Sequence, residues 1–239
     1  MKVPSTEVQN NFGQYLKIAA QQEDVIVTRK GKEMVRISCY DKENAVAEAN
    51  AAYDTGDKKW TTYEEFLELT ENSDLRYELI DGEVFILHSP NYYHQVVVSE
   101  IYGTFYNWFK GKKCRPLTAP FDVTLLKGKE NINVVQPDII VMCDTENIDE
   151  KGRYKGVPTL VVEVLSESTK RNDMLKKLDL YMQTDVKEYW IVDPMKKEMY
   201  VYSFNQKDIQ DYKVYLHHHT MQSDVFEGLE IKLEEIFTY

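Results

Sequence analysis

Two acidic residues lie where the sequence is otherwise apolar, and buried acids of this kind need a partner. Glu163 is the only charged residue in the run from Thr159 to Ser166, whose apolar and β-branched residues predict a buried central strand. Asp138 follows Pro137 at the head of a second strongly apolar segment. If the two strands are neighbours, their carboxylates form an oxygen-rich pocket that suits Mg²⁺ or Mn²⁺.

A third ionisable residue lies on a helix expected downstream of the Glu163 strand. Asp173, Lys177 and Tyr181 recur at every fourth position, so they share one helix face. If this face meets the two acids, the ammonium of Lys177 can orient an attacking water or stabilise charge developing on a phosphoryl group. A divalent ion would lower the pKa of that water. The alternatives are structural: Asp138 caps a strand and Lys177 is a solvated helix residue.

The elements that must position these residues form a domain from about residue 60 to the end. Two Thr-x-x-Glu capping boxes begin a first helix. Asp81-Gly82 predicts a hairpin turn, and apolar residues at every fourth position predict a helix over residues 92–110 that ends at Gly111. Strands are expected at residues 122–126, 134–142, 159–165, 188–193 and 198–202, with 212–219 and 229–233 completing the sheet or packing beside it. Because a helix over residues 169–183 lies between two of these strands, the fold class is mixed α/β.

Histidines and cysteines contribute less to the predicted site. His94 falls in the first turn of the helix over residues 92–110, where a capping or packing role and a functional role are both open. The three histidines at 217–219 alternate faces on an expected strand, so a surface position is preferred to a metal site. The cysteines have unrelated spacings and are assigned neither a disulfide nor a metal role: Cys39, Cys114 and Cys143.

Charge is distributed unevenly along the 239 residues. The net charge of −11 and the 43% apolar residues predict a globular protein and argue against indiscriminate coating of nucleic acid. No apolar run approaches a membrane span and the N-terminus lacks a signal-peptide core, so we expect a cytoplasmic protein. In residues 1–42 seven basic residues outnumber five acidic ones, which predicts a separate module with a different partner.

The pattern in residues 1–42 predicts a strand, a helix and a hairpin around the turn Arg29-Lys30-Gly31-Lys32. A unit this small buries too little apolar surface to be stable as a monomer, so dimerisation is expected. Residues 43–59 are rich in alanine and charge, and we expect them to link this module to a second domain over residues 60–239.

The first module resembles the DNA-binding half of the Phd/YefM antitoxin family. The resemblance rests on the helix start over residues 5–16 and on the Thr-Arg-x-Gly-Lys turn over residues 28–32. It implies a dimer that binds an operator-like DNA site, with Arg29, Lys30 and Lys32 as phosphate contacts. A solvated basic turn on a dimerisation hairpin is the alternative.

The second domain resembles the Uma family of restriction endonucleases, part of the PD-(D/E)XK nuclease superfamily. The segments that carry the resemblance are Tyr77–Val84, His94, Pro137-Asp138, Val162–Ser166, Asp173 with Lys177 and Tyr181, and Glu188–Pro194. It implies a restriction-endonuclease-like core, a mixed sheet flanked by helices, in which Asp138 and Glu163 bind the metal and a lysine lies nearby. Glu78 matches an additional acid from the early hairpin.

One position departs from the superfamily pattern. The lysine there stands two residues after the second acid, where this chain has Leu165. Lys177 replaces that lysine only if its helix folds back over the end of the Glu163 strand. The resemblance allows such a migration.

The combined hypothesis is a metal-dependent DNA endonuclease, a homodimer or higher homo-oligomer that hydrolyses phosphodiester bonds. Asp138, Glu163, Lys177 and Glu78 form its site, Mg²⁺ or Mn²⁺ is its cofactor, DNA is its partner, and no membrane contact is expected. The alternative is a non-catalytic, antitoxin-like DNA-binding regulator that keeps the nuclease fold, which Leu165 and the acidity of the larger domain favour.

Overall fold

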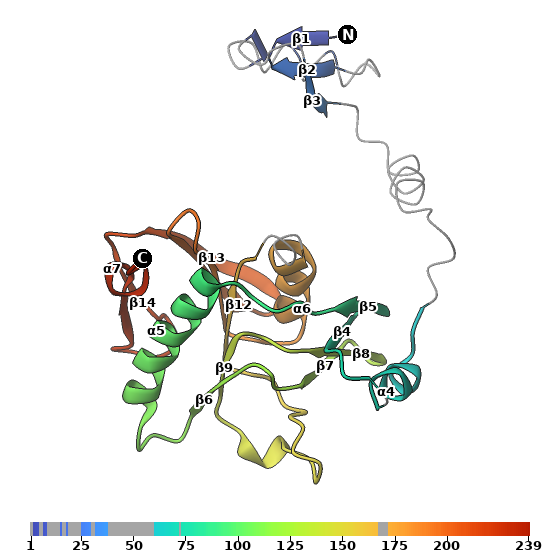
Figure 1. Cartoon of the computed structure of the whole chain (residues 1–239), viewed down its shortest axis with the longest axis vertical. Coiled ribbons are helices and arrows are strands. Elements are labelled where there is room, and N and C mark those ends of the chain that lie inside the picture. Colours follow the sequence, from blue (N-terminus) through green and yellow to red (C-terminus); the bar gives the residue numbers. More distant parts are fainter. Residues whose placement is uncertain are drawn as a thin grey trace. The chain divides into compact units, whose positions relative to one another are not determined.

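The computed structural model describes residues 2–4, 7–8, 15, 18, 25–29, 32–37, 60–71, 73–166 and 172–239. The chain divides into two compact units, Met1–Lys58 and Lys59–Tyr239 (Figure 1). The linker expected over residues 43–59 lies outside the described residues. Each unit is considered by itself.

The N-terminal unit contains a three-stranded sheet. Strand β1 (Lys2–Pro4) is parallel to β2 (Val25–Arg29), and β2 pairs antiparallel with β3 (Lys32–Ile37), so the expected hairpin is confirmed. Val3 and Val25 belong to a small buried cluster. Most of the expected helix lies outside the described residues.

The second unit is built on a six-stranded mixed sheet with the order β13-β12-β11-β10-β9-β6. Central strands β10 and β11 are parallel, and every other neighbouring pair in this sheet is antiparallel. The strands are β6 (Arg115–Thr118), β9 (Ile139–Met142), β10 (Leu160–Val164), β11 (Glu188–Asp193), β12 (Glu198–Asn205) and β13 (Asp208–Leu216). The mixed α/β class predicted from the sequence is confirmed.

A second, four-stranded sheet of this unit has the order β5-β4-β8-β7. Its strands are β4 (Tyr77–Ile80), β5 (Glu83–Ile86), β7 (Val123–Lys127) and β8 (Asn131–Val135). The turn between β4 and β5 has positive φ at Asp81 (48°) and Gly82 (73°), as the Asp-Gly signal predicts. A separate two-stranded sheet joins β14 (Thr220–Gln222) to β15 (Glu230–Lys232).

Helices cover both faces of the large sheet. Val162 and Val164 of β10 pack in one core with helix α5 (Tyr92–Phe109), whereas Val161 and Leu165 pack in another with α6 (Leu178–Gln183). Because alternate residues of a strand point to opposite faces, α5 and α6 lie on opposite sides of β10 (Figure 1). The described residues of this unit also form α4 (Tyr63–Glu71), η1 (Thr145–Asn147), the π-helical turn η2 (Asn172–Lys177) and α7 (Leu233–Ile236).

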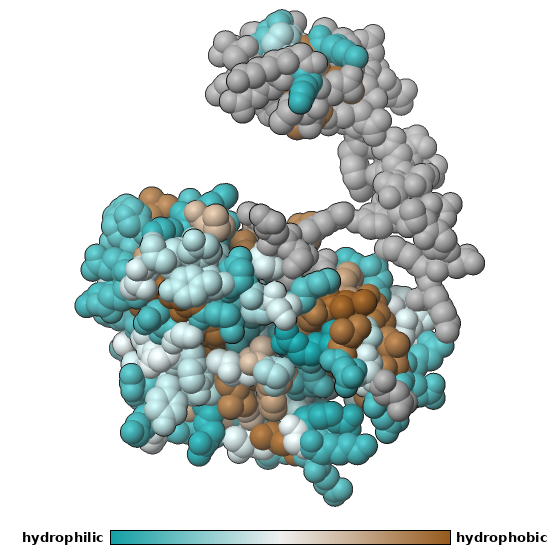
Figure 2. All heavy atoms as spheres, viewed as in Figure 1, coloured by the Kyte–Doolittle hydropathy of each residue, from teal (hydrophilic) through white to brown (hydrophobic). Residues whose placement is uncertain are grey.

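Local signals explain where two of the helices begin. At α4, Thr62 N donates to Glu65 Oε2 (3.0 Å) and Glu65 N donates to Thr62 Oγ1 (3.2 Å), which is a reciprocal capping box. At α5, His94 N donates to the Asn91 side chain at 3.0 Å. In the part of the chain that the structure describes, no helix has the length and apolarity to cross a membrane. The face drawn in Figure 2 is mainly hydrophilic where it is coloured, with an apolar area over β5 and its neighbours.

The prediction of one strand over residues 134–142 is wrong. Strand β8 ends at Val135 in the small sheet, and β9 begins at Ile139 in the large sheet. Pro137 lies between them, and proline lacks the N–H that a continuous ladder needs. The chain therefore passes from one sheet to the other at Gln136-Pro137-Asp138.

The strand expected over residues 212–219 is also too long. Strand β13 ends at Leu216, and His217 and His218 form an exposed turn. The preferred surface position of these histidines is confirmed.

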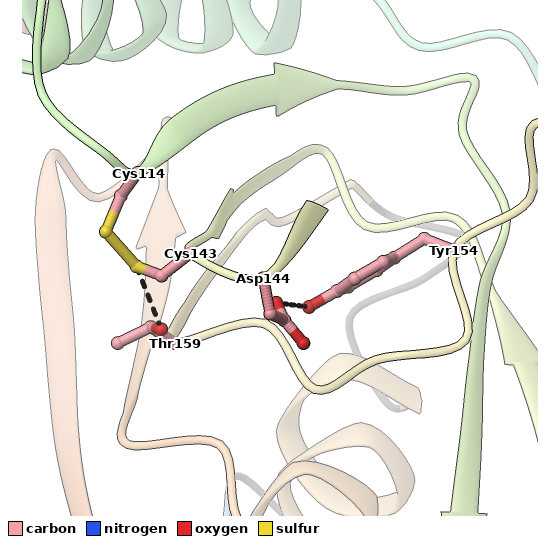
Figure 3. The surroundings of a disulfide bond; sticks show 5 residues. All are labelled: Cys114, Cys143, Asp144, Tyr154 and Thr159. Atoms are coloured by element: carbon pink, nitrogen blue, oxygen red, sulfur yellow. Dashed lines mark hydrogen bonds between the residues drawn. A yellow bond between two sulfur atoms is a disulfide. The ribbon is translucent and has the colours of Figure 1, made fainter. Parts of the chain in front are cut away.

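A disulfide joins Cys114 to Cys143, contrary to the sequence analysis, which assigned no pairing (Figure 3). Arg115 of β6 pairs with Met142 of β9, so the two cysteines lie side by side at the ends of adjacent strands. Their separation of 29 residues hides this proximity in the sequence. Thr159, which directly precedes β10, donates its hydroxyl to Cys143 Sγ at 3.3 Å, so the start of β10 lies beside the disulfide.

Candidate active site

Asp138 and Glu163 lie on neighbouring strands, as expected. Val162 of β10 pairs with Ile139 of β9, and the same antiparallel register continued by one residue places Glu163 opposite Asp138. The N–H of Val164 donates to Asp138 Oδ2 at 2.8 Å, which fixes the carboxylate against β10. The side chain of Asp138 is 19% exposed, so part of it faces solvent.

The Lys177 helix folds back over the end of β10. The Nζ atom of Lys177 lies 2.9 Å from Glu163 Oε1, 2.9 Å from Glu78 Oε1 and 3.5 Å from Asp173 Oδ1. All four side chains are at most 4% exposed. The turn η2 ends at Lys177, and π-helical turns are frequent at functional sites.

Glu78 brings the small sheet into the same cluster. It lies on β4, and Glu78 Oε1 accepts the N–H of Gln136 at 2.8 Å in addition to the Lys177 contact. Gln136 belongs to the segment that crosses from β8 to β9. The structure therefore brings together all four residues predicted for the site.

Two buried tyrosines support the cluster. Tyr181 donates its hydroxyl to Glu163 Oε1 at 2.9 Å, and Tyr189 donates to the backbone oxygen of Asp173 at 3.0 Å. Burial and the neighbouring acids raise the pKa of both hydroxyls well above the usual value, so both remain protonated donors. The four-residue spacing correctly predicts the position of Tyr181, whereas the apolar strand that carries Tyr189 gives no sign of its hydrogen bond.

His94 contacts the site directly, a role that the sequence left open. Its Nε2 atom lies 3.2 Å from Asp138 Oδ2, and Gln95 Oε1 lies 3.2 Å from its Nδ1. Burial lowers the pKa of His94, but the hydrogen bond and charge of Asp138 outweigh it, so the net pKa is raised above 6.5. His94 thus holds Asp138 by a contact separate from the backbone N–H of Val164.

The electrostatics of the cluster favour a protonated lysine among acids. Burial raises the pKa of Glu163, Lys177 opposes that rise, and the nearby acids Asp173, Asp138 and Glu78 add to it, so the net pKa lies well above 4.5. Burial lowers the pKa of Lys177, but the surrounding carboxylates reverse this and raise it well above 10.5. The ammonium is therefore charged at neutral pH, while Glu163 binds a proton more readily than an ordinary glutamate.

Three of the four residues predicted for the site line one cleft of about 530 Å³. Asp138, Glu163 and Lys177 face it together with His94, and Arg76 lies on its wall. Within the part of the chain that the structure describes, Asp138 Oδ1 and Glu163 Oε2 accept no hydrogen bond. Two carboxylate oxygens therefore remain for a ligand in the cleft.

The donor set fits a hard divalent cation that keeps part of its water shell. No group of three or more His, Cys, Asp or Glu side chains among the described residues forms a ready-made metal centre. Mg²⁺ is commonly held by one or two carboxylates plus waters and substrate oxygens, and Asp138 and Glu163 supply that number. The oxygen ligands suit Mg²⁺ or Mn²⁺ better than a softer metal.

The predicted DNA contacts of the N-terminal unit can be located only in part. Lys32 begins β3 and is exposed. Arg29 ends β2, but its side chain and all of Lys30 lie outside the described residues. Their contact with DNA stays a prediction.

Comparison with known proteins identifies the second unit. Residues 63–234, well over half of the chain, match the model of the Uma2 family, which is described as "Putative restriction endonuclease". The chain belongs to this family. The Uma resemblance of the larger domain is thereby confirmed, and the match does not include the N-terminal segment, whose antitoxin resemblance stays a prediction.

Two similar proteins extend the comparison of this Uma2 chain. "Uncharacterized protein slr1290" of Synechocystis is 28% identical over 144 residues, which cover 59% of this chain and 73% of that protein. A solved structure from Anabaena variabilis, described as "a putative nuclease belonging to DUF820", has a TM-score of 0.61 at 19% identity and covers 74% of this chain and 97% of its own. The structural match shows a shared fold.

Proposed function

We propose that the protein is a metal-dependent DNA endonuclease that hydrolyses phosphodiester bonds. One observation supports the proposal most directly. Asp138 and Glu163 lie on neighbouring strands, and each has a carboxylate oxygen that accepts no hydrogen bond from the described residues. Both residues line the cleft that Lys177 also lines. Membership of the Uma2 family supports the same class of reaction, and the Anabaena protein with this fold is described as a nuclease.

Asp138 and Glu163 would hold Mg²⁺ or Mn²⁺. When bound, the ion neutralises the two carboxylates, polarises the phosphodiester and lowers the pKa of a coordinated water. Because metal ligands must be deprotonated and the pKa of Glu163 is raised, metal affinity should increase with pH.

The chain's own residues have distinct tasks in this proposal. Lys177 faces the cleft as a permanent ammonium and positions the attacking water or the phosphate oxygens. Glu78 holds Lys177 through Oε1 and serves as a further ligand or base. Tyr181 holds Glu163 by a hydrogen bond to Oε1, and His94 holds Asp138.

The N-terminal unit would recruit DNA. Its expected basic turn and dimerisation follow from the antitoxin resemblance, and exposed Lys32 is compatible with a phosphate contact. In this proposal the protein is a homodimer or higher homo-oligomer whose partner is DNA.

Cleavage of plasmid and linear DNA by purified protein, with and without Mg²⁺ or Mn²⁺, tests the proposal. Wild-type protein should cut only with metal, and Asp138→Ala should lose both cleavage and the metal-induced shift of the melting temperature. Arg115→Ala, which changes an exposed residue of β6 outside the cleft lining, is the matched control and should retain both. The proposal fails if wild-type protein cuts nothing and Asp138→Ala leaves metal binding unchanged.

A non-catalytic DNA-binding regulator is the second candidate. Two observations favour it: Leu165 occupies the usual lysine position, and the net charge of −11 lies in the larger domain, because residues 1–42 carry an excess of basic residues. A gel-shift assay showing specific operator binding without metal-dependent cleavage would select this alternative.

A further inference from the structure

A second pocket, of about 450 Å³, adjoins the active-site cleft. Arg76 and Gln136 line both cavities, so the two meet at these side chains. Helix α4 contributes Tyr63 and Phe66 to the second pocket, and Tyr77 of β4 lies on its wall. No residue of this pocket belongs to the four proposed catalytic residues.

Arg76 continues the strand that carries Glu78. The backbone oxygen of Arg76 accepts the N–H of Leu87 at 2.9 Å, which extends the pairing of Tyr77 with Ile86 by one step. Residues two apart in a strand point to the same face and are roughly 6.7 Å apart. The side chain of Arg76 therefore leaves the strand on the same face as Glu78, and it lines both the active-site cleft and the second pocket.

The cation of Arg76 has no acidic partner among the residues that the structure describes. Arg153 in the same pocket is neutralised by Asp149, which accepts from Nη2 and from Nε at 2.9 Å each. Lys151 is exposed and also lacks an acidic partner in the described segments. Glu71 and Asp122 also line the pocket, so Arg76 and Lys151 are local cationic positions at which an anion can bind, and the pocket as a whole is not strongly positive.

The other walls suit a nucleobase. Tyr63 is partly exposed and offers aromatic surface from α4, whereas Phe66 is almost fully buried in the core against which Tyr63 packs. Base–aromatic stacking is a common means of binding unpaired bases. Among the described residues, buried Gln136 Oε1 finds no hydrogen-bond partner, and Asp122 beside it accepts from Gln136 Nε2 at 2.8 Å. A volume of about 450 Å³ falls in the range of small-molecule sites.

We propose that this pocket binds the nucleotide next to the scissile phosphodiester, with its base against Tyr63 and its phosphate at Arg76. The inference rests on the proposed nuclease function and narrows its substrate. A base that is still paired and stacked in a duplex cannot enter a pocket of this kind. The substrate is therefore DNA that is single-stranded or locally unpaired beside the cut.

The test is binding of a short single-stranded oligonucleotide that carries 2-aminopurine, by the full chain in EDTA, followed by anisotropy and by base fluorescence. Arg76→Ala should weaken binding about tenfold and reduce the slope of log K against log salt by about 0.7, as expected for one lost phosphate contact on a single strand. Tyr63→Ala should weaken binding about tenfold and abolish the change in 2-aminopurine fluorescence.

Conservative and matched variants separate this role from misfolding. Tyr63→Phe keeps the ring and should bind as the wild type does, and Arg76→Lys should recover most of the salt dependence. Arg115→Ala and Tyr106→Ala remove an exposed arginine and an exposed tyrosine from outside the pocket, and both should remain within about twofold of wild type. Melting temperatures of all variants report whether the fold is intact.

The proposal is overturned if wild-type protein does not bind the single strand, if Arg76→Ala and Tyr63→Ala bind it unchanged, or if a hairpin duplex gives the same affinity and fluorescence change. Binding is measured without cleavage. If the protein binds the oligonucleotide through Arg76 and Tyr63 but cuts no DNA, the proposed pocket is supported and the proposed nuclease function is contradicted. A protein that cuts DNA, but whose oligonucleotide binding is unchanged by Arg76→Ala and Tyr63→Ala, would support the nuclease function and contradict the proposed pocket.

Discussion

The Nζ atom of Lys177 lies 2.9 Å from Glu163 Oε1 in the large sheet and 2.9 Å from Glu78 Oε1 in the small sheet. One buried ammonium therefore joins two sheets and compensates acids that would otherwise repel one another. Removing one partner of a buried pair costs about 3–5 kcal/mol because the remaining charge is left uncompensated. The candidate catalytic lysine is thus also a structural residue.

Lys177→Met should lower the free energy of unfolding by about 3 kcal/mol and abolish cleavage, because Glu78, Glu163 and Asp173 lose their shared cation. Urea denaturation and the DNA cleavage assay measure the two effects. Lys176→Met is the matched control: its ammonium contacts Glu83 at 2.7 Å but is 29% exposed, so it should cost at most about 1 kcal/mol. Equal losses in the two variants would contradict the proposed role of Lys177.

Glu163→Gln should separate stability from activity. A carboxyl whose folded pKa is raised stabilises the protein most below its ordinary pKa of 4.5, and this contribution is lost as pH rises through the folded value. The amide cannot ionise, so the variant should lose less stability between acidic and neutral pH than wild type while its cleavage rate falls about 100-fold or more.

Glu188→Gln provides the control for that comparison. Glu188 is another buried acid of the large sheet with a raised pKa, caused mainly by burial, but it bonds Ser223 and Asp224 and does not line the cleft. Its substitution should leave cleavage unchanged. A similar loss of activity in both variants would indicate a general packing effect.

The ion pair between His94 and Asp138 should be visible by NMR titration of metal-free protein. Wild-type His94 should titrate above 6.5, and Asp138→Asn should lower its pKa because burial is then less opposed. The stability contributed by His94 is complete below pH 6.5 and is lost as pH rises through the folded pKa. An unchanged His94 pKa in Asp138→Asn would show that the pair does not form in solution.

Local sequence signals correctly predicted turns and helices whose formation depends on residues close together in the sequence. Asp81-Gly82 forms the expected turn, and the apolar stripe expected over residues 92–110 forms α5 (Tyr92–Phe109). The break at Pro137 was missed because apolar residues on both sides fit either sheet equally well. The Cys114–Cys143 pairing was missed because strand neighbours far apart in sequence leave no periodic signal.

The candidate active site was also predicted only in part, because some of its contacts join segments that are far apart in the sequence. The cost of burying Glu163 pointed to a partner, and the four-residue spacing correctly placed Lys177 and Tyr181 toward it. The His94–Asp138 contact depends on how α5 packs across the sheet, which no spacing within the sequence encodes.

Substitution of Leu165 tests whether a lysine ammonium at this position can replace the ammonium of Lys177. Leu165 is 6% exposed, packs with Val161 and Tyr181 in the core on the α6 side of the sheet, and donates its N–H to Val192 O at 2.8 Å. A lysine at this position would place a charge in apolar packing without a designated partner. Leu165→Lys should therefore lower the free energy of unfolding by about 3 kcal/mol.

The same substitution should not rescue Lys177→Met. In the double variant the ammonium would start two residues beyond Glu163, while the methionine introduced at position 177 would fill the space between Glu78, Glu163 and Asp173. Cleavage by the double variant should remain at background, as measured beside both single variants, with Leu165→Met as the volume-conserving control that keeps wild-type activity. Recovered cleavage in the double variant would show that the cleft accepts the ammonium from the strand, and that the fold-back of Lys177 is one of two equivalent solutions.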